Sequence, residues 1–361
     1  MTTSTKPSET FIVLIPGFPE DEKDTTCLPA QQLLIREINR LYPSLQITVL
    51  AFQYPFHNKE YYWFGNRVIS FDGRNKNGVS RLITWLKVFL KLRSLQKQKN
   101  VVGVFSCWCT ECAFVGKYFT EINHLPHYIW ICGQDARTNN KLVKLIRPNA
   151  NSLIAISDFL VREFFKNHKI KPAHTIPIGI DPSLFTNKKN VARDICCLGV
   201  GSLIPLKQYE IFIDIVEQLK QQYPDINTMI CGEGPEFEKL KGLIHTKNLQ
   251  KNILLAGKKS HDEVLQLMCR SKILLHPSSY EGFGAVCIEA LYAGAHVVSF
   301  CNPLDRAVEH WHIVEDNAFM LLKTREILED PETDFSPVLV SDMEASAASI
   351  MKLFDYPAAL R

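Results

Sequence analysis

The segment Pro277-Ser-Ser-Tyr-Glu281-Gly-Phe-Gly284 carries the residue types of an anion-binding loop. An apolar run that predicts a buried strand precedes it, and a helical pattern begins after it at Ala285. Gly282 and Gly284 allow the backbone to come close to a ligand, and the first amides of a helix have no partner within the helix. The segment therefore predicts a phosphate site at a helix N-terminus.

Two glutamates accompany this loop. Glu281 stands at the strand end, and Glu289 stands more than one turn into the helix, among apolar neighbours. Carboxylates so separated can contact two ends of an extended ligand, and beside a phosphate they are suited to sugar hydroxyls. A nucleotide sugar fits this combination. The alternative is that Glu281 is an ordinary loop charge and that Glu289 is a solvated helix residue.

A second loop, Gly201-Ser202-Leu-Ile-Pro-Leu-Lys207, follows another predicted strand. Lys207 stands just before a helical pattern, where its ammonium group could neutralise a diphosphate, although a lysine ahead of a helix is more often solvated. No Asp-x-Asp motif stands at a strand end to hold a divalent cation. The charge of a diphosphate would then fall to lysine and helix amides, so we expect no metal ion or other cofactor.

Short apolar runs alternate with helical patterns along the chain, which is typical of βαβ units and parallel sheets. The alternation begins at residues 11–16 and restarts at residue 195. We therefore predict an α/β fold of two Rossmann-like, doubly wound domains, which 361 residues can accommodate. The domains are placed at residues 1–180 and 181–340, with the polar linker Asn187-Lys-Lys-Asn190 near their junction.

Residues 341–361 are expected to form a C-terminal helix that packs back on the first domain. Ligands of open parallel sheets bind outside the carboxyl ends of the strands. Two such domains would therefore face each other across a cleft lined by the loops described above.

Several motifs occur together in the second half of the chain. They are Ile176-Pro-Ile-Gly-Ile-Asp181, the Gly201–Lys207 loop, Gly232-Glu-Gly-Pro235, and Glu281 followed eight residues later by Glu289. As a set, over roughly residues 150–325, they resemble a GT-B glycosyltransferase of the retaining family 4 (glycosyl transferases group 1) type. The first half resembles the acceptor domain of that family more loosely, through Pro16-Gly17-Phe18-Pro19 and Ile131-Cys132-Gly133-Gln134-Asp135.

The resemblance implies a retaining, metal-independent transfer of a sugar from a nucleotide-sugar donor to a glycan, lipid-linked or small-molecule acceptor. Glu281, Lys207 and Asp135 would be the catalytic residues: Glu281 contacts the donor sugar, Lys207 stabilises the leaving diphosphate, and Asp135 faces the reacting sugar. Glu289 would hold the ribose. The remaining donor-binding positions would be Gly17, Gly201, Ser202, Gly234, Gly282, Phe283, Gly284 and Ala285.

Two positions depart from the family pattern. Ser202 stands where the family often has arginine, and Cys132 stands where it often has histidine. These departures motivate an alternative, a catalytically inactive GT-B-shaped binding or partner subunit. A phosphorylase-like or epimerase-like use of the same fold is a third possibility.

Charge is unevenly distributed along the chain. Residues 1–180 hold 23 Lys and Arg against 13 Asp and Glu, whereas residues 181–361 hold 18 against 25, for a net charge of +3. Residues 73–110 hold eight basic residues and no acidic one. The helical pattern within these residues has a narrow polar stripe, formed by Ser80, Thr84, Lys87, Lys91, Ser94 and Gln98. Just upstream, the aromatic residues 61–64 are expected to form a loop.

This basic segment supports two interpretations. One is a peripheral contact with anionic headgroups at the inner face of a membrane. The other is a helix packed on a sheet with its lysines in water. The aromatic residues could contact a sugar or a lipid, or could cover the core. The pI of 8.2 and the lack of a recognisable binding module argue against a nucleic-acid partner.

Eleven cysteines, mostly in apolar stretches, are expected to be free thiols in a reducing compartment. Cys109-Thr-Glu-Cys112 is interpreted as packing, and His310-Trp-His312 as a surface pair rather than a metal site. No apolar run approaches the roughly 18 residues of a membrane span, and no secretory signal is visible at residues 1–9. We therefore expect a cytoplasmic protein.

Overall fold

A computed structural model of the chain describes residues 9–185 and 191–356. It divides into two compact units: unit 1 is Met1–Ile178 together with Met343–Arg361, and unit 2 is Gly179–Asp342. The chain therefore passes between the units twice, at 178/179 and at 342/343. The predicted linker at 187–190 lies outside the described residues.

Unit 1 is built on an eight-stranded sheet of order β3-β4-β2-β1-β5-β6-β7-β8. The pairings are parallel apart from the antiparallel β3–β4 hairpin. The strands are β1 (Glu9–Gly17), β2 (Gln46–Tyr54), β3 (Glu60–Trp63), β4 (Asn66–Ser70), β5 (Asn100–Cys107), β6 (His127–Ile131), β7 (Leu153–Ala155) and β8 (His174–Thr175).

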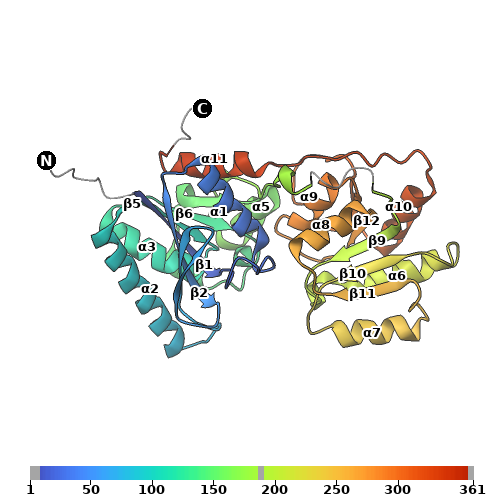
Figure 1. The fold of residues 1–361 in the computed structure, drawn as a ribbon, viewed down its shortest axis with the longest axis horizontal. Helices are drawn as coiled ribbons and strands as arrows, with labels where there is room; N and C mark the ends of the chain where they lie inside the picture. The colour runs from blue at the N-terminus through green and yellow to red at the C-terminus, as the bar shows by residue number, and fades with distance from the viewer. Residues whose placement is uncertain (1–8, 186–190, 357–361) are drawn as a thin grey trace. The chain divides into compact units, whose positions relative to one another are not determined.

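Helices cover both faces of this sheet (Figure 1). The helices α2 (Val79–Gln98) and α3 (Glu111–Asn123) share a core with the sheet on one face. On the other face, α1 (Pro29–Leu41) packs with α11 (Met343–Leu353). Two further helices, α4 (Leu142–Ile146) and α5 (Asp158–His168), complete the unit. Because helices cover both faces, the central strand β1 is apolar along residues 11–15 without alternation.

Unit 2 contains a six-stranded, fully parallel sheet of order β11-β10-β9-β12-β13-β14. The helices α6, α7 and α10 share one core with it, and α8 and α9 pack on the opposite face (Figure 1). The strands are β9 (Ile195–Val200), β10 (Thr228–Cys231), β11 (Ile253–Gly257), β12 (Ser271–His276), β13 (His296–Ser299) and β14 (Trp311–Ile313). The helices are α6 (Tyr209–Lys220), α7 (Phe237–Thr246), α8 (His261–Cys269), α9 (Ala285–Tyr292) and α10 (Asn317–Glu329).

The strand order of unit 2 is the doubly wound order 3-2-1-4-5-6, counted from β9. The order reverses between β9 and β12, so the loops after these two strands diverge from the same point. Ligands of doubly wound sheets bind at this switch point. The fold therefore places residues 201–207 (the β9 loop) and residues 277–284 (the β12 loop) side by side at the position where a ligand site is expected.

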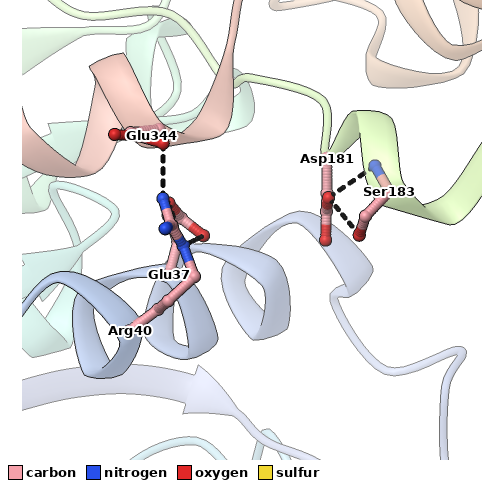
Figure 2. Close-up of polar contacts among 5 residues, drawn as sticks. All are labelled: Glu37, Arg40, Asp181, Ser183 and Glu344. Atoms are coloured by element: carbon pink, nitrogen blue, oxygen red, sulfur yellow. Dashed lines mark hydrogen bonds and ion pairs between the residues drawn. The ribbon is translucent and has the colours of Figure 1, made fainter. Parts of the chain in front are cut away.

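Helix α11 lies far from α1 in sequence but is fixed on it in unit 1. Arg40 of α1 forms ion pairs with its neighbour Glu37 and with Glu344 of α11 (Figure 2). Beyond the helix, the ring of Phe354 meets Phe11 of β1 edge-on, with centroids 4.8 Å apart. Gly103 makes room for this ring, because a Cβ at position 103 would lie 2.4 Å from Phe354.

In unit 2, the segment after the first crossing begins with a short turn. Asp181 accepts hydrogen bonds from the backbone N–H of Ser183 at 2.9 Å and from its hydroxyl at 2.6 Å (Figure 2). This arrangement opens the 3-10 turn Pro182–Phe185. Phe185 then packs edge-on against Tyr292 of α9, with ring centroids 4.9 Å apart, and so connects the segment to the helix that follows the β12 loop.

Two sequence interpretations are corrected by the structure. The aromatic run is not a loop, because Glu60–Trp63 is a strand of the β3–β4 hairpin; Trp63 is fully buried against Phe18, whereas Tyr62 is exposed. The histidines at 310 and 312 are not a surface pair, since both rings stack on His296, with centroids 4.4 and 5.3 Å away. Cys107, Cys109 and Cys112 are buried free thiols. Among the described residues, no helix is both long and apolar enough to cross a membrane.

Candidate functional site

The β9 and β12 loops meet through side chains and backbone. Lys207 Nζ lies 2.6 Å from Glu281 Oε2, and the backbone N–H of Ser279 donates to the carbonyl of Leu206 at 3.0 Å. Two charged residues that the sequence assigned to separate loops therefore form one ion pair at the switch point. This pair is the centre of the candidate site.

The surroundings of Glu281 keep its carboxylate ionised. Its side chain is 24% exposed, and Nε2 of the buried His276 lies 3.3 Å from its Oε2. Burial alone would raise the pKa of Glu281, but the contacts with His276 and Lys207 outweigh burial and lower the pKa to about 2. Burial lowers the pKa of His276. His276 was not among the predicted site residues, although its place at the end of the predicted strand, five residues before Glu281, could have indicated it.

The β12 loop leads directly into α9. Gly284 has φ +78 and precedes the first helical residue, and a Cβ there would lie 3.4 Å from Cγ of Glu281. The side chain of Glu281 therefore lies over the start of α9, where helix amides face outward. Phe283 is buried and anchors the loop in unit 2. Gly282 is buried, and Ala285, the first residue of α9, is partly buried.

Glu289 is not a solvated helix residue. Its Oε1 lies 2.8 Å from Nε2 of His261, the first residue of α8, and both side chains are only 15% exposed. An ordered carboxylate near the α9 surface can accept hydrogen bonds from vicinal hydroxyls. His261 belongs to a different helix, and nothing in the local sequence links it to Glu289.

The loops after β9 and β10 touch backbone to backbone. The N–H of Gly201 donates to the carbonyl of Cys231 at 3.0 Å, and that of Leu203 donates to the carbonyl of Glu233 at 2.9 Å. A Cβ at Gly234 would lie 2.4 Å from the carbonyl oxygen of Leu203. Gly234 therefore lets the two loops approach each other. Ser202 is exposed in the β9 loop.

Gly232→Ala is expected to destabilise the protein by roughly 2–4 kcal/mol. The new Cβ would lie 1.9 Å from the carbonyl oxygen of Gly201, and the φ of +153 is unfavourable for alanine. Thermal unfolding followed by circular dichroism measures the change. Gly242→Ala is the matched control, because position 242 lies on the exposed side of α7 with open space around it, so stability should not fall. Equal unfolding curves for Gly232→Ala and the parent would contradict the prediction.

In unit 1, Gly17 is the last residue of β1, buried beside Tyr54 and Cys27. Asp135 is also buried, and its carboxylate faces its own loop: Oδ1 accepts from the N–H groups of Cys132 (3.1 Å) and Gly133 (2.8 Å), and Oδ2 accepts from that of Cys109 (2.8 Å). Burial raises the pKa of Asp135 to about 6 despite these bonds. The geometry gives Asp135 a positioning role in the loops after β5 and β6.

Within residues 9–185 and 191–356, one group of three side chains could hold a metal ion, namely Glu309, His310 and Asp334. None of the three belongs to the β9 or β12 loop.

Residues 184–332 match the family model described as "Glycosyl transferases group 1". The chain is 25% identical over 170 residues to the phosphatidylinositol N-acetylglucosaminyltransferase GPI3 subunit of Saccharomyces cerevisiae, over 44% of this chain and 38% of the yeast subunit. It therefore spans well under half of that relative. An uncharacterized glycosyltransferase of Methanocaldococcus jannaschii is 25% identical over 62% of this chain and 61% of its own length.

A solved structure has the same fold over nearly the whole chain. Anabaena HepE, crystallised in complex with UDP and glucose, superimposes with a TM-score of 0.66, covering 96% of this chain and 97% of HepE. Sequence identity in that comparison is 17%, so the likeness concerns the fold alone.

Proposed function

We propose that this protein is a retaining, metal-independent glycosyltransferase, because it has a GT-B fold and its residues 184–332 match the glycosyl transferases group 1 model. The observation that carries the proposal is the Lys207–Glu281 ion pair at the switch point of unit 2, beside the N-terminus of α9. The donor is a nucleoside-diphosphate sugar. The acceptor is a lipid-linked or other glycan, a choice supported by the phosphatidylinositol-directed name of the yeast relative.

The proposed mechanism assigns opposite tasks to the two charges. Lys207 and the first amides of α9 stabilise the negative charge that develops on the diphosphate as the bond to the anomeric carbon breaks. Glu281, held ionised, stabilises the positive charge that develops on the sugar. Since both groups are fixed before the donor binds, little reorganisation is needed during the reaction. In this proposal lysine and amides do what a divalent cation does elsewhere, so transfer proceeds in the presence of EDTA.

A second candidate function is a GT-B-shaped binding or partner subunit without turnover. The exposed Ser202 favours it, because the serine supplies no cation to the diphosphate. The two candidates differ in one observable. An enzyme releases nucleoside diphosphate slowly from the donor even without acceptor, whereas the inactive subunit binds nucleotide or sugar without cleaving the donor.

Titration calorimetry against a panel of nucleotides and nucleotide sugars, with EDTA present, tests the proposal. We expect one nucleoside diphosphate and its sugar to bind, and Glu289→Ala to weaken binding by about tenfold through the loss of a charge-assisted hydrogen bond. Glu238→Ala is the control, because Glu238 is an exposed glutamate on α7. No binding by any member of the panel would refute the donor site. Equal weakening by the two variants would remove Glu289 from it.

We also propose that the protein works in the cytoplasm, at the inner face of a membrane. Several buried cysteines are free thiols, including Cys197, Cys231 and Cys287, which suits a reducing compartment. The excess of basic residues in the first half of the chain supports contact with an anionic surface.

A further inference from the structure

Helix α2 of unit 1 carries an apolar face that nothing in the unit covers. Its inner face, with Val88, Leu92 and Leu95, is buried on the sheet and α3. On the outer face, five aliphatic side chains are between 49% and 73% exposed. We call this set the α2 face: Val79, Leu82, Ile83, Leu86 and Leu90.

The α2 face is one continuous stripe. Its members follow each other at intervals of three, one, three and four residues, so their side chains lie along one side of the helix over three turns. Single exposed leucines are common on soluble proteins, but a contiguous apolar patch marks a site of interaction. The polar stripe seen in the sequence does not cover it. Thr84 is buried, and Lys91 turns to Glu60, with Nζ 3.3 Å from Oε2.

The same side of α2 becomes cationic in its last two turns. Arg93 lies seven residues after Leu86, and Lys97 lies seven after Leu90, so both continue the stripe. Arg93, Lys97 and the flanking Lys87 are exposed, and within the described residues none of them forms an ion pair. No acidic residue occurs between positions 73 and 110. The positive charge beside the α2 face is therefore not neutralised within the segment.

We infer that the α2 face, with Lys87, Arg93 and Lys97, docks unit 1 on an anionic lipid bilayer. An interfacial helix of this kind lies in the membrane plane, with aliphatic side chains below the headgroups and basic side chains among them. Apolar burial and the attraction of each basic residue to anionic lipid both contribute. Charge complementarity selects this partner. The inference rests on the proposed membrane location but not on the transfer reaction.

Co-sedimentation of the full chain with vesicles tests the inference. The vesicles are phosphatidylcholine alone or phosphatidylcholine with phosphatidylserine. We expect binding to the mixed vesicles, much weaker binding to the neutral ones, and a decrease as salt is raised. Leu82→Ser with Leu86→Ser should weaken binding by about 100-fold, and Arg93→Gln with Lys97→Gln by roughly 30-fold at low salt.

Matched variants separate the α2 face from general effects. Leu322→Ser on α10 replaces an equally exposed leucine of unit 2, and Lys241→Gln on α7 replaces an exposed lysine. Neither should change vesicle binding. Equal binding to both vesicle types, no binding, or equal loss in the control variants would overturn the inference. So would a concentration-dependent dimer that the leucine variants abolish, because the α2 face would then belong to a second copy. Nucleotide calorimetry should be the same in all these variants, so failure here is distinguishable from failure of the donor site.

Discussion

Glu281→Gln is expected to lower kcat by about 10²- to 10³-fold, the range seen when a preorganised electrostatic group is removed from an active site. The variant keeps the shape of the side chain but loses the charge that Lys207 and His276 hold in place. Donor affinity should change far less, because the charge on the sugar develops only in the transition state. The measurement is release of nucleoside diphosphate at saturating donor, with calorimetry on the same variant.

The pH dependence gives this prediction a second readout. The pKa of Glu281 is about 2, below the ordinary value of 4.5. The group is therefore ionised throughout the range in which activity can be assayed, and the stability that its contacts provide is lost only as pH falls below about 4.5 towards 2. Glu281→Gln should thus lower kcat by the same factor at every pH between about 5 and 8. If Glu281→Gln lowered kcat in only part of that pH range, a group other than Glu281 would be titrating there.

The control for this experiment is an ion pair elsewhere in unit 2. Glu217 on α6 pairs with Lys247, away from the β9 and β12 loops. Glu217→Gln should leave kcat within about twofold, because exposed ion pairs contribute roughly 0–1 kcal/mol to stability. Full activity of Glu281→Gln would eliminate the proposed role of the pair, and loss of donor binding without loss of kcat would make it a binding element only.

Asp135→Ala is expected to lower the free energy of unfolding of unit 1 by about 3 kcal/mol or more. It would leave the N–H groups of Cys109, Cys132 and Gly133 without their acceptor, and each unsatisfied buried group costs roughly 1–3 kcal/mol. Urea unfolding followed by tryptophan fluorescence is a suitable measurement, because four of the five tryptophans lie in unit 1: Trp63, Trp85, Trp108 and Trp130.

Asp21→Ala is the matched control. Asp21 also accepts two backbone N–H bonds, from Lys23 at 2.8 Å and Asp24 at 3.1 Å, but in an exposed loop where water can replace it. Its loss should cost less than about 1 kcal/mol. Equal effects of the two variants, or full stability with lost turnover in Asp135→Ala, would contradict a positioning role and favour direct contact with substrate.

The pKa of Asp135 sets the sign of a pH effect on stability. Its value in the folded protein is about 6, raised from 3.8, so between these values the folded state binds more protons than the unfolded state. The contribution of Asp135 is therefore largest below about pH 3.8 and declines as pH rises to 6, by about 3 kcal/mol. Asp135→Asn cannot ionise and should lack this decline.

The strand–helix order and the loops that carry Lys207 and Glu281 could be predicted from the sequence, because both follow from local patterns. The apolar runs before Gly201 and before Pro277 predicted the strands that the structure shows as β9 and β12. The match over residues 184–332 agrees with the glycosyl transferases group 1 part of the resemblance drawn from the loop motifs, while the retaining, family 4 assignment stays a prediction. The spacing of residues in the sequence could not predict the direct contact between Lys207 and Glu281, because that contact depends on β9 and β12 being neighbours in the sheet.

Contacts between distant segments account for the rest. His261 reaches Glu289 from another helix, so no spacing rule links them. The orientation of α2 was also hidden. In a helix that is apolar on nearly all sides, the residue pattern does not indicate which side packs on the sheet. The polar stripe suggested that the polar side faces solvent, whereas Thr84 of the stripe is buried and several leucines are exposed. The aromatic run was assigned to a loop, but pairing with β4 makes it a strand, a tertiary effect that overrides local pattern.

The double crossing between the units has a consequence for synthesis. Unit 2 is continuous in sequence, whereas unit 1 is completed only by residues after 342. During synthesis on the ribosome, the strands of unit 1 emerge first. The contacts of Phe354 with Phe11 and Gly103, and the ion pair of Glu344 with Arg40, can form only after all of unit 2 has been made. The unit that is begun first is therefore finished last, and the site around Phe11 and Gly103 that Phe354 covers is the last part of unit 1 to be completed.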